Sequence, residues 1–112
     1  MSKYRNKRIT ADNHTFDSIK EYRRYCELKI LQRAGYIEQL QLQVPYELIP
    51  SQREGGKVVE RKVKYVADFV YFDKERGQVI VEDVKSEATK TELYRVKKKL
   101  MRYVHGIEVR EV

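Results

Sequence analysis

The chain has 112 residues, of which 41% are hydrophobic and 37% charged, so it can form one small domain with a modest core but not two domains. The 24 Lys and Arg residues exceed the 17 Asp and Glu residues, and the net charge of +7 favours a polyanionic partner such as nucleic acid, although a soluble basic protein would look the same. No apolar run is long enough to cross a membrane, and the first residues lack the apolar core of a signal peptide. We therefore expect a cytoplasmic protein with no membrane partner. With one Cys and two His, any metal ion should be held by carboxylates.

The chain begins with a basic arm, residues 1–8, which contains no acidic residue. The arm is expected either to contact nucleic acid or to be a frayed terminus. The cations predicted to make that contact are Arg5, Lys7 and Arg8. A helix is then predicted to begin at Asp17 or Ser18, because Glu21 follows Ser18 at the spacing of a capping box. Gly35 is a suitable residue to end this helix.

Three extended segments are predicted to follow the helix. Residues 41–49 alternate apolar and polar side chains, and a proline among them indicates an edge strand. Residues 51–57 are predicted to form a turn, and residues 58–72 one long strand or a bent pair. After a second turn at residues 73–77, residues 78–85 form a third strand.

A second helix is predicted over residues 90–104. Its apolar stripe consists of Leu93, Val96, Leu100 and either Tyr103 or Val104. The opposite face carries the cations Arg95, Lys98, Lys99 and Arg102. We expect this face either to contact phosphate groups or to be a solvated helix surface. Residues 107–112 form a last strand, parallel to the third, so the chain is predicted to be a single α/β domain over residues 1–112, with the order α-β-β-β-α-β and a mixed sheet flanked by helices.

The most informative residues lie on the second and third predicted strands. If Asp73 pairs with Gln78 across the turn, Asp68 lies opposite Asp83, and Lys85 lies on the same face. Two carboxylates at facing positions, with Cβ atoms about 5 Å apart, repel one another. A divalent cation such as Mg²⁺ would neutralise them and could polarise a phosphate, while a lysine stabilises negative charge. The alternative is that both acids lie on a solvated sheet face near surface lysines.

Two glutamates complete the set of candidate acids. Glu21 borders the apolar side of the first helix, so it could be a third acid of the same site. It could equally be a helix cap or an ion-pair partner of Arg24. Glu82 lies on the face opposite Asp83 and is expected to point into solvent.

These features resemble the PD-(D/E)XK nuclease superfamily, which has an acid on the first helix, Asp on a hairpin strand and Asp-x-Lys on the next strand. More narrowly, the whole chain resembles a small family of uncharacterised phage and prophage proteins presumed to be nucleases. The segments that carry this narrower resemblance are residues 3–7, 16–21, 31–35, 65–69 and 81–85. The sequence departs from the superfamily at two positions, since Ala67 replaces the proline and Asp83 takes a position that is often Glu.

The resemblance implies a restriction-endonuclease-like core and a catalytic site. The implied catalytic residues are Glu21, Asp68, Asp83 and Lys85, and the first three are the implied metal ligands. The cofactor would be Mg²⁺, with Mn²⁺ as a substitute. The substrate would be DNA, such as a Holliday junction or a flap, in the cytoplasm of a bacterium that carries the phage or prophage. A junction nuclease needs two sites, which favours a homodimer. The alternative function is that of a non-catalytic nucleic-acid-binding protein on the same scaffold.

Overall fold

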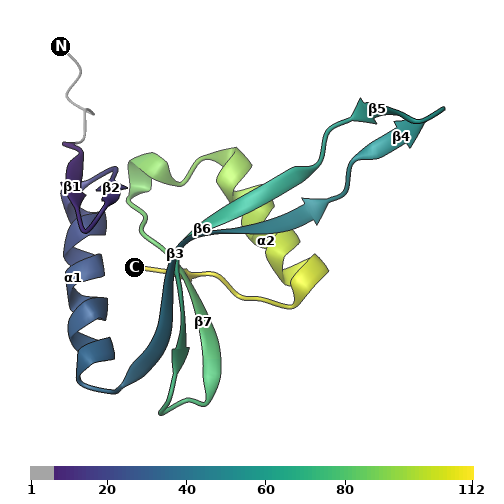
Figure 1. Ribbon diagram of the computed structural model, residues 1–112. Helices are drawn as coiled ribbons and strands as arrows, with labels where there is room; N and C mark the ends of the chain where they lie inside the picture. The colour runs from purple at the N-terminus through teal and green to yellow at the C-terminus, as the bar shows by residue number, and fades with distance from the viewer. Residues whose placement is uncertain (1–6) are drawn as a thin grey trace.

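A computed structural model describes residues 7–112 of the chain. Its centre is a four-stranded sheet with helices α1 (Ile19–Arg33) and α2 (Glu92–His105) packed against it (Figure 1). The strands, in their order across the sheet, are β3 (Ile37–Ile49), β6 (Val63–Asp73), β7 (Gln78–Asp83) and β8 (Arg110–Glu111). The first three strands are antiparallel, whereas β8 runs parallel to β7. The predicted α/β class and mixed sheet are therefore confirmed.

Two small hairpins and a short helix complete the described part. The elements are β1 (Ile9–Ala11), β2 (His14–Phe16), β4 (Gln52–Glu54), β5 (Lys57–Glu60) and the 3-10 helix η1 (Glu87–Thr89). The prediction of a simple turn over residues 51–57 was wrong, because β4 and β5 form a hairpin around Gly55 and Gly56. Both glycines have positive φ, 55° and 79°, as a two-residue hairpin turn requires.

Helix α1 begins and ends where the sequence predicts. The Ser18 hydroxyl accepts a hydrogen bond from the backbone N–H of Glu21 at 3.1 Å, which caps the first turn. Gly35 follows the last turn with φ of 87°, a conformation that suits glycine. Tyr25 and Leu28 are the buried apolar residues on this helix, so they fix the face that packs on the sheet.

Helix α2 presents a different face from the one predicted. Its buried residues are Tyr94 and Met101, whereas Leu93 is 63% exposed and Tyr103 is 88% exposed. The predicted stripe is therefore wrong as a buried face. Successive helical residues are 100° apart, so the stripe that contains Leu93 lies about a quarter turn from the line through Tyr94 and Met101. The tyrosine and methionine side chains reach the sheet. Of the predicted stripe, Leu100 packs partly against this core, whereas Leu93 and Val96 are exposed.

The core consists of two clusters, one beside each helix. The buried residues of the α2 side are Leu48, Tyr65, Ala67, Val70, Val81, Tyr94, Met101 and Val109. Those of the α1 side are Phe16, Tyr25, Leu28, Ile37, Phe69, Tyr71 and Ile80. Strand alternation sends the neighbours Phe69 and Val70 to opposite faces, so β6 supplies both clusters. Within residues 7–112, neither helix has the length and apolar character needed to span a bilayer.

Candidate active site

One open cavity of about 460 Å³ lies where the start of α1, the first half of β6, the end of β7 and the start of α2 meet. Its lining includes all four residues predicted for catalysis, namely Glu21, Asp68, Asp83 and Lys85. The structure therefore brings together side chains that are up to 64 positions apart in the sequence. Two lysines that the sequence did not single out, Lys64 and Lys97, also line this cavity.

The hairpin of β6 and β7 has the predicted register. Phe69 pairs with Glu82, which leaves Asp68 and Asp83 at the next facing positions, just beyond the last paired residues. Because the ladder ends there, the backbone N–H of Val84 is free to donate to Asp68, and it does so to Oδ2 at 2.8 Å. This hydrogen bond fixes the Asp68 carboxylate at the end of β7.

Asp83 is held by two other side chains. It is only 4% exposed, and its Oδ2 accepts a hydrogen bond from the Tyr65 hydroxyl at 2.6 Å. The Lys85 ammonium lies 3.6 Å from Oδ1 of the same carboxylate and 4.2 Å from the centre of the Tyr94 ring. A ring face attracts a cation, so Lys85 is held between a carboxylate and an aromatic ring. Burial raises the pKa of Tyr65, which keeps its hydroxyl protonated as a donor to Asp83.

Glu21 is both a helix cap and a residue of the cavity. Its Oε2 accepts a hydrogen bond from the backbone N–H of Asp17 at 3.1 Å, and its Oε1 accepts one from the Gln43 side-chain amide at 3.3 Å. The glutamate is 6% exposed. Arg24, the other predicted partner, forms ion pairs with other glutamates instead. The capping and site interpretations are therefore compatible, because each uses a different carboxylate oxygen.

Gln43 is a residue of the site that sequence reasoning missed. Its Nε2 lies 3.3 Å from an oxygen of Glu21 and 3.3 Å from an oxygen of Asp68, so one amide group joins the two acids. It lies in β3 with φ of 53°, a left-handed conformation that costs about 1 kcal/mol for a residue other than glycine. No motif around Gln43 indicates this conformation; only its position across from Asp68 in the β3–β6 pairing could have drawn attention to it.

The buried acids perturb one another electrostatically. Burial, followed by the charge of Asp68, raises the pKa of Glu21 from 4.5 to about 7. Burial, followed by the proximity of Asp68, raises the pKa of Asp83 from 3.8 to about 7. Lys85 lowers both pKa values, but by less than these effects raise them. Near neutral pH the cavity therefore stabilises added positive charge or bound protons.

Glu82 does not point into solvent, and that prediction was wrong. Its side chain is fully buried and receives a fork of hydrogen bonds from Arg24, with Nε at 2.8 Å and Nη2 at 2.6 Å. The Tyr71 hydroxyl donates to the same carboxylate. Both faces of β7 are covered, so a charge on the α1 side is buried and needs a partner, which α1 supplies. The ion pair also raises the pKa of Arg24.

The three carboxylates of the cavity, Glu21, Asp68 and Asp83, are of the chemical type that binds hard cations. Within residues 7–112, no three Asp, Glu, His or Cys side chains converge closely enough to coordinate one ion. Three carboxylates are nevertheless the ligand type that Mg²⁺ prefers. The amide of Gln43 places a partial positive charge between Glu21 and Asp68, in a gap where a cation would be attracted by both.

The predicted nucleic-acid contacts of the N-terminal arm fall at the limit of the described chain. Arg5 lies outside the described residues. Lys7 and Arg8 are exposed, and Arg8 Nε lies 3.9 Å from an oxygen of Asp17. Asp17 itself lines the cavity, so Arg8 is close to the edge of the site.

The cations predicted on α2 lie apart from the acidic cavity. Arg95, Lys98, Lys99 and Arg102 line a second cavity together with acidic side chains. Lys98 Nζ lies 3.3 Å from a Glu111 oxygen, and Arg102 Nη1 lies 4.0 Å from a Glu108 oxygen. Since Lys97 is the α2 cation that lines the active-site cavity, the predicted cationic face is turned away from it.

Comparison with known proteins supports one assignment. A family model described as "Protein of unknown function (DUF1064)" matches residues 1–111. The chain belongs to this family. The match to DUF1064 includes every element from β1 to β8, so the acidic cavity and both small hairpins lie within the family region. No curated protein and no solved structure matches the chain.

Proposed function

We propose that the protein is a metal-dependent endonuclease that hydrolyses phosphodiester bonds in DNA. The observation that carries the proposal is the convergence of Glu21, Asp68, Asp83 and Lys85 on one open cavity. An acid on the first helix, Asp on a hairpin strand and Asp-x-Lys on the next strand are the features that the PD-(D/E)XK resemblance predicts. The order α1, β3, β6, β7, α2, β8 is consistent with a restriction-endonuclease-like core.

The proposed cofactor is Mg²⁺, with Mn²⁺ as a substitute. Asp68 and Asp83 would hold the ion, with Glu21 as a third ligand. When bound, the ion would polarise a phosphate oxygen and lower the pKa of a bound water molecule. The raised pKa values of Glu21 and Asp83 support this proposal, because a cation would relieve the repulsion that helps to raise them.

The chain's own residues supply positioning and charge. Lys85 is held by Asp83 and the Tyr94 ring, so its ammonium can stabilise negative charge on a phosphate in the cavity. Tyr65 orients the Asp83 carboxylate. Glu21 is positioned at the edge of the cavity by the backbone N–H of Asp17 and the side-chain amide of Gln43.

The proposed substrate is branched DNA, such as a flap or a four-way junction, cleaved by a homodimer. The cavity is open to solvent, which supports a substrate larger than the cavity itself. Lys64 and Lys97 at the cavity wall would attract the phosphates on both sides of the cleaved bond.

The test is cleavage of fluorescent linear, flap and four-way-junction DNA with Mg²⁺, Mn²⁺ or EDTA. We expect metal-dependent products from the wild type. Asp68→Asn, Asp83→Asn and Lys85→Ala should each lower the rate by about 10²-fold or more while DNA affinity stays within about threefold. Glu75→Gln, which changes an exposed carboxylate in the β6–β7 turn, is the matched control and should cleave normally. DNA binding without cleavage in either metal would instead support the non-catalytic alternative.

A further inference from the structure

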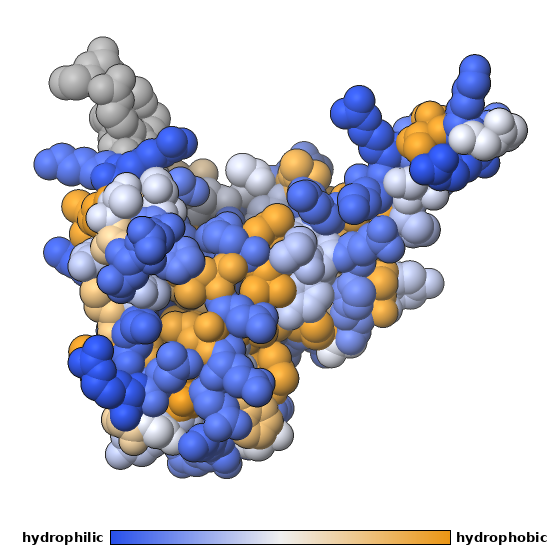
Figure 2. Space-filling model, viewed as in Figure 1, coloured by the Kyte–Doolittle hydropathy of each residue, from blue (hydrophilic) through white to orange (hydrophobic). Residues whose placement is uncertain are grey.

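The hairpin of β4 and β5 projects from the body of the molecule. We call residues 51–62 the hairpin arm; every one of them is exposed. Figure 1 shows the arm extending beyond the ends of β3 and β6, and in Figure 2 it stands apart with hydrophilic side chains reaching outward. A two-stranded hairpin with no packed face gains little stability from its own contacts. A partner that covers the arm would explain why the chain keeps it extended.

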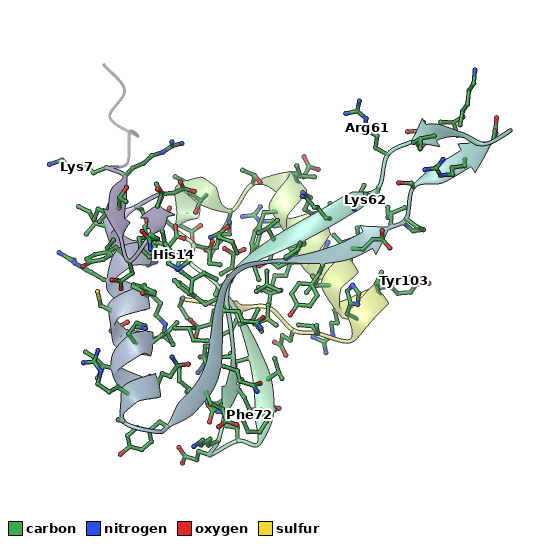
Figure 3. All side chains as sticks on the ribbon, viewed as in Figure 1. Lys7, His14, Arg61, Lys62, Phe72 and Tyr103 are labelled. Atoms are coloured by element: carbon green, nitrogen blue, oxygen red, sulfur yellow. The ribbon has the colours of Figure 1, made fainter. Side chains whose placement is uncertain are left out.

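The charge of the arm indicates the chemistry of that partner. The arm and the start of β6 carry the cations Arg53, Lys57, Arg61, Lys62 and Lys64, against the acids Glu54 and Glu60. In the described part of the chain, none of these five cations forms an ion pair, whereas Lys98 and Arg102 on α2 do. Figure 3 shows Arg61 and Lys62 at the base of the arm, with Arg61 directed into solvent. Unpaired cations on a projecting ribbon are complementary to a polyanion.

The base of the arm is continuous with the active-site cavity. Lys64 lines that cavity, and it also lines a second hollow with Arg61, Lys62 and the apolar Val58. A nucleic acid with one phosphate near Asp83 could therefore continue along Lys64 and onto the arm. The cationic face of α2 has no such continuity, since no residue is shared between its cavity and the acidic one.

The shape of the arm distinguishes between nucleic acids. The major groove of B-form DNA is about 12 Å wide and admits a two-stranded ribbon, whereas the major groove of A-form RNA is too deep and narrow for side chains to read. At about 3.3 Å per residue, the longer strand of the arm, β5 (Lys57–Glu60), is roughly 13 Å long, which is somewhat less than half a turn of DNA. Val58 and Val59 are exposed on the arm, and their side chains could make apolar contacts with the methyl groups of thymine in the major groove.

We infer that the hairpin arm binds in the major groove of a B-form DNA duplex that flanks the cleaved position. This inference rests on the proposed nuclease function, because the acidic cavity defines where the cleaved strand lies. It assigns the main duplex contact to the arm rather than to α2. It also means that the substrate must include a double-stranded segment beside the branch.

Fluorescence anisotropy of the full chain in EDTA tests this inference with three probes of one sequence: a 24-base-pair DNA duplex, the RNA duplex and the DNA single strand. The arm variant combines Arg53→Ala, Lys57→Ala, Arg61→Ala and Lys62→Ala. The matched control removes the same charge from α2 with Arg95→Ala, Lys98→Ala, Lys99→Ala and Arg102→Ala. We expect the arm variant to lose about tenfold or more in affinity for the DNA duplex and to lower its log–log salt slope by roughly 3 units. The control should lose less than about threefold.

The wild type should also bind the DNA duplex about tenfold more tightly than the RNA duplex, and the arm variant should lose that preference. Equal losses in the two variants would overturn the inference, as would equal affinity of the wild type for both duplexes. Light scattering gives a further outcome: an arm variant that changes the oligomeric state but not DNA affinity would assign the arm to a second copy of the chain. Since every residue of the arm is exposed, thermal melts should show that the arm variant remains folded; the same melts check that the control remains folded without its ion pairs to Glu108 and Glu111.

Cleavage assays separate this inference from the proposed function. If duplex binding depends on the arm but no metal-dependent cleavage is seen, the inference about the arm is supported and the proposed nuclease function is refuted. Normal cleavage of flap DNA by the arm variant, with unchanged KM, would be consistent with the proposed nuclease function but would refute the inference that the arm binds the DNA duplex.

Discussion

Replacement of Asp83 by Asn should stabilise the protein in the absence of metal. The carboxyl group has a pKa of 3.8 in an ordinary environment and about 7 in the folded chain. Between these values the folded state binds more protons than the unfolded state, so the free energy of unfolding falls as the pH rises. The full difference corresponds to about 4 kcal/mol at pH 8. Because Tyr65 and Lys85 can readjust around a charged Asp83, we expect Asp83→Asn to recover about half of it, roughly 2 kcal/mol.

Thermal melts in EDTA from pH 4 to pH 8 measure this effect. At pH 8 the Asn variant should melt about 8 °C above the wild type, and the difference should shrink as the pH falls toward 4. Glu75→Gln, an exposed change of the same kind, should follow the wild type throughout. An Asp83→Asn variant that melts lower than the wild type at pH 8, or a difference that does not depend on pH, would refute the reasoning that burial and Asp68 disfavour the ionised form of Asp83.

Three other predictions follow from the contacts of the site. Addition of Mg²⁺ should raise the melting temperature of the wild type more at pH 8 than at pH 5.5, because the carboxylates must be ionised to bind it; melts of Asp83→Asn should show little response at either pH. Gln43→Gly should relieve a left-handed φ and raise stability by about 1 kcal/mol relative to Gln43→Ala, while both variants lower single-turnover cleavage by about tenfold because Glu21 and Asp68 lose their shared donor. Arg24→Met should lower the free energy of unfolding in urea by about 3 kcal/mol, since it leaves Glu82 buried without its cation, and a stability loss below 1 kcal/mol would contradict the burial of that pair.

Local signals in the sequence were sufficient to predict the main helices and strands and to predict that Asp68 and Asp83 lie side by side. The capping residues around Ser18 and the turn before Gln78 fixed where α1 begins and how β6 and β7 align. The alignment then placed Asp68 beside Asp83 without knowledge of any other contact. These predictions succeeded because each depends on residues close together in the chain.

The features that were missed depend on distant residues or on unusual backbone geometry. The burial of Glu82 requires Arg24, which lies 58 positions away, so the local strand pattern shows only an acid that alternates with apolar residues. The periodicity of α2 gave the relative positions of its apolar residues around the helix, but not which side of the helix faces the sheet. That side is the one that carries the buried Tyr94 and Met101. The positive φ of Gln43 has no signal in the residue type. In the hairpin arm, the strand β5 falls within the predicted bent pair over residues 58–72, whereas β4 was missed because its residues have no buried face to create an alternating pattern.

The ion pair between Arg24 and Glu82 has a consequence for how the chain can vary. Arg24 follows Glu21 by about one helical turn, and Glu82 immediately precedes Asp83, so the pair closes a loop that sets the spacing of two cavity acids from outside the cavity. An exchange of neighbours, Glu82→Asp with Asp83→Glu, would keep composition, charge and both acids. It would nevertheless shorten the link to α1 by one methylene and lengthen the reach into the cavity by another. The order of these two adjacent acids therefore helps to set the distances within the site. An insertion or deletion between Glu21 and Arg24 would likewise change those distances and alter the site as much as the loss of an acid.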